Sequence, residues 1–91
     1  MRLAVGAWPN PWREETAIRW SVPSRGEVSL TVLDLQGRLV RTLAQGVSDP
    51  GLHLARWDGR GDHGEAAQPG VYFARLIAGN RKVTSKLVML R

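Results

Sequence analysis

Trp57-Asp58-Gly59-Arg60, followed along the chain by Pro69-Gly70-Val71-Tyr72-Phe73, predicts the end of one β-strand, a glycine-rich connection and the start of another strand. Asp-Gly and Pro-Gly are turn dipeptides, because aspartate can bond nearby backbone, proline presets φ and glycine accepts a positive φ. Gly61 and Gly64 also lie in this connection and favour turns there. Apolar residues that alternate with others resume at Val71, as in a strand with one buried face.

The same succession of strand, turn and strand recurs along the chain. Residues 16–22 and 28–32 alternate with a period of two, and residues 34–37 predict a tight turn. Residues 52–57 carry apolar side chains on both faces, which predicts a central position in a sheet. We expect short strands at residues 3–7, 16–22, 28–32, 39–44, 52–57, 71–78 and 82–90. About seven such antiparallel strands predict an all-β protein with a β-sandwich fold.

Length and composition narrow the class of protein. The 91 residues predict one domain that spans residues 1–91. The absence of cysteine excludes disulfides and cysteine-ligated zinc sites. No apolar run approaches the roughly 18 residues that a membrane helix needs. We therefore expect no membrane insertion. The segment at residues 2–6 is too short for the apolar part of a signal peptide, so an export signal would lie on a longer parent chain or be the module itself.

The formal charge is +5, and 11 of the 13 basic residues are arginine. Such a charge can indicate binding to nucleic acid or to an anionic surface. The arginines are spread along the sequence, however, and only Arg81-Lys82 forms a local pair. Binding of nucleic acid usually involves clustered basic side chains with interleaved aromatic residues. We therefore expect solvated surface arginines and no nucleic-acid partner.

Asp58 and Asp62 are weak candidates for a calcium site in the glycine-rich loop. Calcium prefers oxygen ligands on flexible loops, but the spacing does not match an EF-hand loop. The alternative, which we favour, is that both carboxylates accept hydrogen bonds from backbone amides and hold the turn. We therefore expect no metal and no cofactor.

The two histidines, His53 and His63, do not form part of a recognisable catalytic set. His53 shares a strand face with Ala55 and Trp57, which predicts a position at the edge of the core. A hydrolase needs a nucleophile close to a histidine and an orienting acid. No serine lies in a nucleophile-elbow sequence, so we expect that the protein is not an enzyme.

The four tryptophans allow two interpretations. They could form a stacking platform for carbohydrate. Trp20 and Trp57 fall at inward strand positions, where they most simply fill a thin core. Trp8 and Trp12 flank Pro9-Asn10-Pro11, which cannot form regular structure, and we expect their side chains to be less constrained.

The last predicted strand, at residues 83–90, is either a structural edge strand or a segment recognised by a partner. Edge strands offer unpaired backbone groups for strand addition. Lys82, Lys86 and Arg91 would discourage unwanted pairing there. The sequence stops directly after this strand, as expected for the C-terminal module of a larger protein.

Six sequence motifs in order resemble the immunoglobulin-like domain of the bacterial flagellar hook-capping protein family. They are also similar to the C-terminal sorting domains of the type IX secretion system. The resemblance covers residues 9–91. Its motifs are Pro9-Asn10-Pro11 with Trp12, residues 18–23, residues 28–34 with 37–43, Trp57–Arg60 with Gly64, Gly70–Phe73, and Lys86–Leu90. One departure is Arg13-Glu14, where the family often repeats Asn-Pro.

The resemblance implies an immunoglobulin-like β-sandwich whose role is recognition. The residues that it marks are Pro9, Asn10, Pro11, Gly37, Trp57, Asp58, Gly59, Gly70, Tyr72, Lys86, Leu87 and Val88. As a sorting module of an exported bacterial protein, the chain would follow upstream domains. It would be read by the secretion machinery at the outer membrane, and it would reach the cell surface or the extracellular space through the periplasm. The alternatives are a structural assembly domain, as in hook-capping proteins, and a carbohydrate-binding module.

Overall fold

The computed structural model describes residues 2–90, while Met1 and Arg91, the ends of the expected domain, lie outside the described residues. All regular elements in this range are strands, so the prediction of an all-β fold is confirmed. The strands are β1 (Ala4–Trp8), β2 (Thr16–Val22), β3 (Gly26–Leu33), β4 (Leu39–Ser48), β5 (Gly51–Trp57), β6 (Gly70–Ala78) and β7 (Arg81–Met89).

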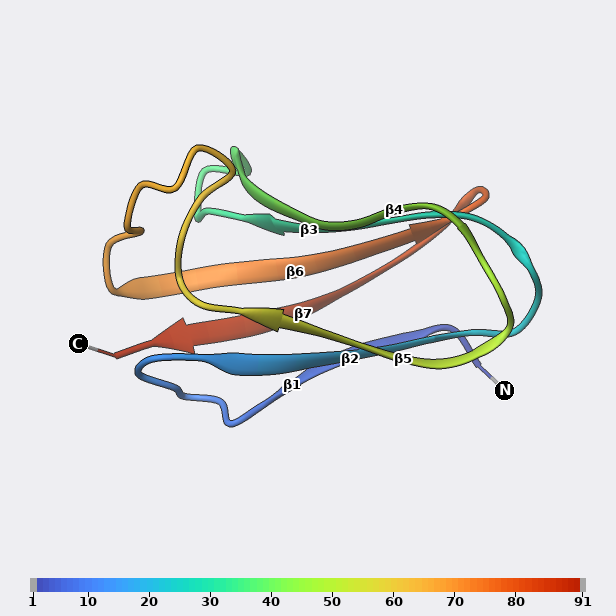
Figure 1. The fold of residues 1–91 in the computed structure, drawn as a ribbon, viewed down its shortest axis with the longest axis horizontal. Helices are drawn as coiled ribbons and strands as arrows, with labels where there is room; N and C mark the ends of the chain where they lie inside the picture. The colour runs from blue at the N-terminus through green and yellow to red at the C-terminus, as the bar shows by residue number, and fades with distance from the viewer. Residues whose placement is uncertain (1, 91) are drawn as a thin grey trace.

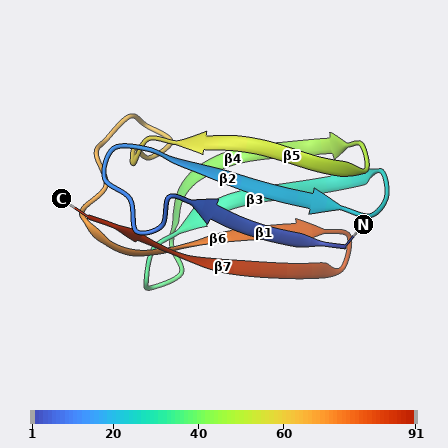
Figure 2. The ribbon, with the colours of Figure 1, turned by 90° about the horizontal axis from the view of Figure 1, so that it is seen from below.

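The strands form two antiparallel sheets that pack face to face. One sheet has the order β1-β2-β5, and the other has the order β4-β3-β6-β7. Figure 1 shows the two layers along their common long axis, with the two chain ends at opposite ends of the molecule. Figure 2 shows that β5 lies on the same side of the sandwich as β4. The described residues extend over 37 × 22 × 20 Å.

The predicted period of two is the reason for this packing. On β2, Thr16, Ile18 and Trp20 face the opposite sheet and are buried, while Arg19 between them is exposed. On β6, Tyr72, Ala74 and Leu76 face the same interior. Burial of one such large apolar side chain stabilises a fold by roughly 1.5–3 kcal/mol, so the alternating pattern holds the two layers together.

The predicted central position of residues 52–57 is wrong. β5 pairs only with β2 and is an edge strand of its sheet. His53, Ala55 and Trp57 point inward as predicted, but Leu52 and Leu54 on the other face are 65% and 57% exposed. Apolar residues on both faces therefore mark an exposed apolar surface here and not a strand covered on both sides.

β4 is longer than predicted and is irregular. It continues to Ser48 through Gly46, whose φ is +121°. Its register with β3 shifts between Leu30 and Thr31 and again between Val32 and Leu33. Beside this irregular part, the Asp62 N–H donates to the Val40 carbonyl at 2.9 Å, and the Thr42 N–H donates to Asp62 Oδ1 at 2.9 Å. The loop after β5 thus covers part of the β4 edge.

Candidate functional site

Four of the six family motifs, those at residues 9–12, 57–64, 70–73 and 86–90, lie at one end of the sandwich together with the turn at Gly37. This is the end at which β5 and β7 finish and β6 begins, on the left in Figure 1. The loop between β1 and β2, the turn between β3 and β4 and the long connection from β5 to β6 meet there. We call this region the motif end.

At the motif end, Pro9-Asn10-Pro11 lies against the outer edge of β7. Asn10 Nδ2 donates to the Lys86 carbonyl at 2.8 Å, and Asn10 Oδ1 accepts from the Val88 N–H at 2.9 Å. Trp12 continues the contact as a parallel bridge, because its N–H donates to the Val88 carbonyl at 3.0 Å and its carbonyl accepts from the Leu90 N–H at 2.7 Å. Residues 10–12 therefore occupy the edge of the last strand from Lys86 onward.

Three aromatic rings pack in a row behind this contact. The ring centroids of Trp12 and Trp57 are 5.1 Å apart with planes tilted by 59°, and those of Trp57 and Tyr72 are 5.3 Å apart in an edge-on arrangement. All three residues are less than a tenth exposed. Such pairs contribute roughly 0.5–1.5 kcal/mol beyond the area they bury. The expectation that Trp12 is less constrained is wrong, because its ring belongs to the core.

Gly59, in the long loop after β5, lies close to the Trp12 end of the aromatic row. Its φ is +80°, and a Cβ built on it would lie 3.2 Å from Met89 Sδ and 3.3 Å from Trp12 Cη2. Trp57 Nε1 donates to the Arg60 carbonyl at 2.9 Å, which fixes the loop directly after the strand. A glycine is needed here both for the backbone conformation and for the close approach to two core side chains.

The carboxylates of Asp58 and Asp62 are occupied by protein groups. Asp58 Oδ1 accepts from the Arg60 N–H at 3.1 Å and lies 3.6 Å from Arg41 Nη1. Asp62 Oδ1 accepts from the Thr42 N–H, and it lies 3.9 Å from Arg41 Nε. Among residues 2–90, no three histidine or acidic side chains are grouped as a metal site would need. In this geometry the two aspartates hold the loop against β4.

Gly37 lies in the turn between β3 and β4, and Gly70 and Tyr72 lie in the first part of β6, at the same end. Gly37 and Gly70 have φ values of +85° and +144°. In the turn that contains Gly37, the Arg38 backbone N–H donates to the Asp34 carboxylate. This hydrogen bond lowers the pKa of Asp34 below its ordinary value of 3.8, although desolvation opposes the shift. Burial raises the pKa of the Tyr72 hydroxyl above 10.0, and the charge on Asp34 raises it further. The Tyr72 hydroxyl donates to the Gln68 carbonyl, so it anchors the end of the long loop.

Three residues of the closing motif Lys86–Leu90 have different surroundings. Leu87 points into the core and is fully buried, whereas the side chains of Lys86 and Val88 lie on the outer face of the sheet. β7 pairs with β6 over nine residues, from Arg81 to Met89. Its second edge is covered from Lys86 onward by residues 10–12. The closing motif is thus part of the folded sandwich, and only its outward side chains are available to a partner.

The two histidines and Trp8 take no part in the contacts described above: His53 packs on Trp20, whereas His63 and Trp8 are exposed. His53 stacks on Trp20 with ring centroids 4.3 Å apart, and its Nε2 lies 2.8 Å from the Asp49 carbonyl oxygen. His63 is an exposed loop residue whose N–H donates to Glu65 Oε1 at 3.1 Å. Trp8 is 75% exposed, and the other three tryptophans are buried. The tryptophans therefore do not form a shared surface platform.

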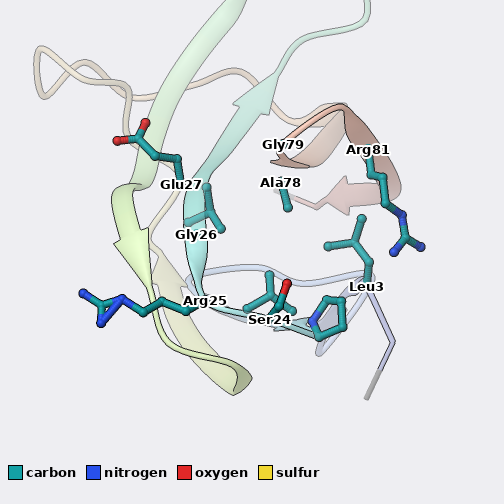
Figure 3. A pocket seen from close by; sticks show the side chains of 11 residues that line it. Leu3, Ser24, Arg25, Gly26, Glu27, Ala78, Gly79 and Arg81 are labelled. Atoms are coloured by element: carbon teal, nitrogen blue, oxygen red, sulfur yellow. The ribbon is translucent and has the colours of Figure 1, made fainter.

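A small pocket lies at the opposite end of the sandwich, and sequence reasoning did not identify it. Its volume is about 230 Å³, and its lining comes from the turns after β2 and β6 together with Leu3. Figure 3 shows Leu3 and Ala78 pointing into this space, while Arg25 and Glu27 extend away from it. The lining combines apolar side chains with polar ones such as Ser24 and Arg81, and it contains no histidine or cysteine. No helix in the described residues is long and apolar enough to cross a membrane.

Comparison with known proteins identifies the fold. The family model described as the FlgD Ig-like domain matches residues 13–81. None of the curated proteins matches the sequence. Among solved structures, the chain is similar to a part of dimeric latent PorU from Porphyromonas gingivalis, with a TM-score of 0.70 and 21% identity over 94% of this chain. It is also similar to a part of PorZ from the same organism, with a TM-score of 0.65 and 23% identity over 97% of this chain.

The two similar structures are much longer than this chain. The match spans 9% of the PorU chain and 12% of the PorZ chain. PorZ is described as an essential bacterial surface component of the type IX secretion system. The predicted immunoglobulin-like fold and the resemblance to this group of domains are confirmed.

Proposed function

The chain belongs to the FlgD Ig-like domain family, and we propose that it is a non-catalytic C-terminal sorting or recognition module of an exported bacterial protein. The observation that carries the proposal is that the same fold occurs as about a tenth of two much longer chains, one of them a surface component of the type IX secretion system. A module of this kind would follow upstream domains, and it would reach the cell surface or the extracellular space with them.

The proposed recognition surface is the outer face of β7 at the motif end. The backbone of Lys86 and Val88 is engaged by Asn10, so a partner has access to side chains and not to a free strand. The Lys86 side chain is exposed on this face. In this proposal the secretion machinery at the outer membrane reads a folded surface that residues 9–12 and the loop after Trp57 keep rigid.

A reporter fused in front of the complete chain, in a host with type IX secretion, tests the proposal. Deleting the last residues would be uninformative, because Leu87 and Met89 belong to the core. The sharper variant is Lys86→Glu, with Arg25→Glu as a matched charge reversal at the other end of the sandwich. Arg25 is 67% exposed in its side chain and makes only a 3.6 Å surface ion pair with Asp49.

We expect the unmodified fusion to be exported, Lys86→Glu to reduce export at an unchanged melting temperature, and Arg25→Glu to be exported normally. Retention of the unmodified fusion inside the cell would overturn the sorting role. Normal export of the Lys86→Glu fusion would overturn the assignment of the recognition surface to β7.

A further inference from the structure

We propose that the free edge of β5 accepts an extended, acidic and apolar segment of another protein as an added antiparallel strand. The proposal does not rest on the sorting role, because it concerns the sheet opposite β7. β5 pairs with β2 along Gly51–Trp57, and no described strand pairs with its other side. An edge strand of this kind presents unpaired N–H and C=O groups to any chain that can extend beside it.

The other three sheet edges carry recognisable protection. β1 has only five residues. β4 has two register irregularities and is partly covered through Asp62. β7 has Arg81, Lys82 and Lys86 and is covered near its end by residues 10–12. Short length, bulges, covering loops and charges are the features by which proteins block edge pairing.

β5 is neither short nor bulged, no described loop pairs with its free side, and its one charged side chain, Arg56, is paired with Glu15. Its seven residues, Gly-Leu-His-Leu-Ala-Arg-Trp, contain no lysine and no proline. Its register with β2 is continuous from Thr16 opposite Trp57 to Val22 opposite Gly51. Its outward positions hold Leu52 and Leu54, which are among the most exposed large apolar side chains in the described residues. A continuous, regular and apolar edge is a favourable template for strand addition.

The outer face of the β1-β2-β5 sheet extends this apolar edge into a wider surface. The register places Leu54 beside Arg19 and Gly6, and it places Leu52 beside Ser21 and Ala4. The next row consists of Arg56, Ala17 and Trp8. Ala4, Gly6 and Ala17 are small, so Trp8, Leu52 and Leu54 are the large apolar side chains of this face.

The charge of this face defines the partner. Its nine outward positions contain two arginines and no acidic residue. Arg56 pairs with Glu15 at 3.1 Å, whereas Arg19 has no ion-pair partner within residues 2–90. A second copy of this chain, with a net charge of +5, would bring further arginines to the same continuous face. An acidic segment would instead offset them, because opposite charges on adjacent strands stabilise pairing and like charges weaken it.

The probe for this site is the synthetic peptide Thr-Glu-Thr-Val-Thr-Leu-Thr with blocked ends. In antiparallel pairing, its glutamate faces Arg56 and its valine and leucine face Leu54 and Leu52. One control peptide has lysine in place of glutamate. A second control has proline in place of both the valine and the threonine before it, because one of two adjacent N–H groups points toward β5 and proline removes that ladder donor.

Binding is measured by amide shifts and hydrogen exchange of the ¹⁵N-labelled chain during titration. We expect slower exchange at β5 amides, about fivefold weaker binding of the lysine peptide and no binding of the proline peptide. Leu54→Lys should weaken binding by about tenfold, since it places a charge on the edge. Val47→Lys on the β4 edge is the matched control, because Val47 and Leu54 are both 57% exposed, and it should bind normally.

Three outcomes would overturn the proposal. The first is unchanged β5 exchange at millimolar peptide. The second is equal loss of binding in the Leu54→Lys and Val47→Lys variants. The third is dimerisation of the unliganded chain through β5, seen by sedimentation and abolished by Leu54→Lys, because the occupant would then be a second copy.

Discussion

Asn10 holds Val88 with a side-chain amide that imitates a neighbouring strand. Its Oδ1 accepts from the Val88 N–H at 2.9 Å, while its Nδ2 donates to the Lys86 carbonyl at 2.8 Å. A primary amide has one acceptor and one donor side, which are the two groups that the edge of a β-strand requires. One side chain from the first part of the chain therefore closes the edge of the last strand.

Replacing Asn10 with alanine should lower the free energy of unfolding by about 1–2 kcal/mol, because the Val88 N–H and the Lys86 carbonyl lose their partners. Asn10→Asp is the control, since its carboxylate can still accept from Val88 but cannot donate to Lys86. Its free energy of unfolding should lie between those of the parent and the alanine variant. Urea denaturation followed by tryptophan fluorescence measures both. An alanine variant as stable as the parent would show that the contact contributes nothing.

Trp12→Ala and Trp8→Ala should have very different effects, although the two tryptophans flank the same Pro9–Pro11 segment. Trp12 is 1% exposed and packs on Trp57, whereas Trp8 is 75% exposed. The Trp12 variant should lose about 3–5 kcal/mol through loss of burial and formation of a cavity. The Trp8 variant should stay within about 0.5 kcal/mol of the parent. Similar losses in thermal or chemical denaturation would contradict the placement of Trp12 in the core.

Gly59→Ala should destabilise the fold more than Gly64→Ala, which isolates packing from backbone strain. Both glycines have positive φ, at +80° and +85°, so each alanine carries the cost of about 1–2 kcal/mol for a left-handed residue. Only at Gly59 would the new Cβ crowd Met89 and Trp12, whereas nothing lies within 4 Å at Gly64. Overpacking adds about 1–3 kcal/mol. Equal melting temperatures for the two variants would argue against the close approach.

The stability of the fold should decrease at alkaline pH partly through Tyr72. Its pKa is raised above 10.0 in the folded chain, mainly by burial. A group with a raised folded pKa contributes stability that is complete below the unfolded pKa and is lost as the pH rises through the folded value. Unfolding free energies measured at pH 8 and pH 11 should therefore differ less in Tyr72→Phe than in the parent. An identical pH dependence in both proteins would show that Tyr72 is not the group responsible.

Sequence periodicity predicted most of the fold because inward and outward side chains alternate on nearly every strand. The prediction was wrong for β5, since Leu52 and Leu54 suggest a covered strand when each is considered only as apolar. Alternation gives the face of a residue, but it does not give the number of neighbouring strands. The edge position is visible only in the structure, where β5 pairs with β2 and with no other described strand.

The motif end was only partly predictable for a similar reason. Trp57 lies on a strand, and its inward position follows from the period of two. Trp12 belongs to no strand and makes a single bridge to Met89, so no periodic signal marks its burial. The role of Asn10 also depends on a contact across 78 residues of sequence, which local patterns do not contain.

The contact between residues 10–12 and β7 also determines how the module bears tension. β1 and β7 run in the same direction along the long axis, and the described chain ends lie at opposite ends of it (Figures 1 and 2). A pull on these two ends slides the Trp12 segment along Met89 and loads its four hydrogen bonds together, not one after another. Because forced unfolding follows the unfolding rate, the simultaneous loading of these bonds should slow unfolding under a pull along the long axis.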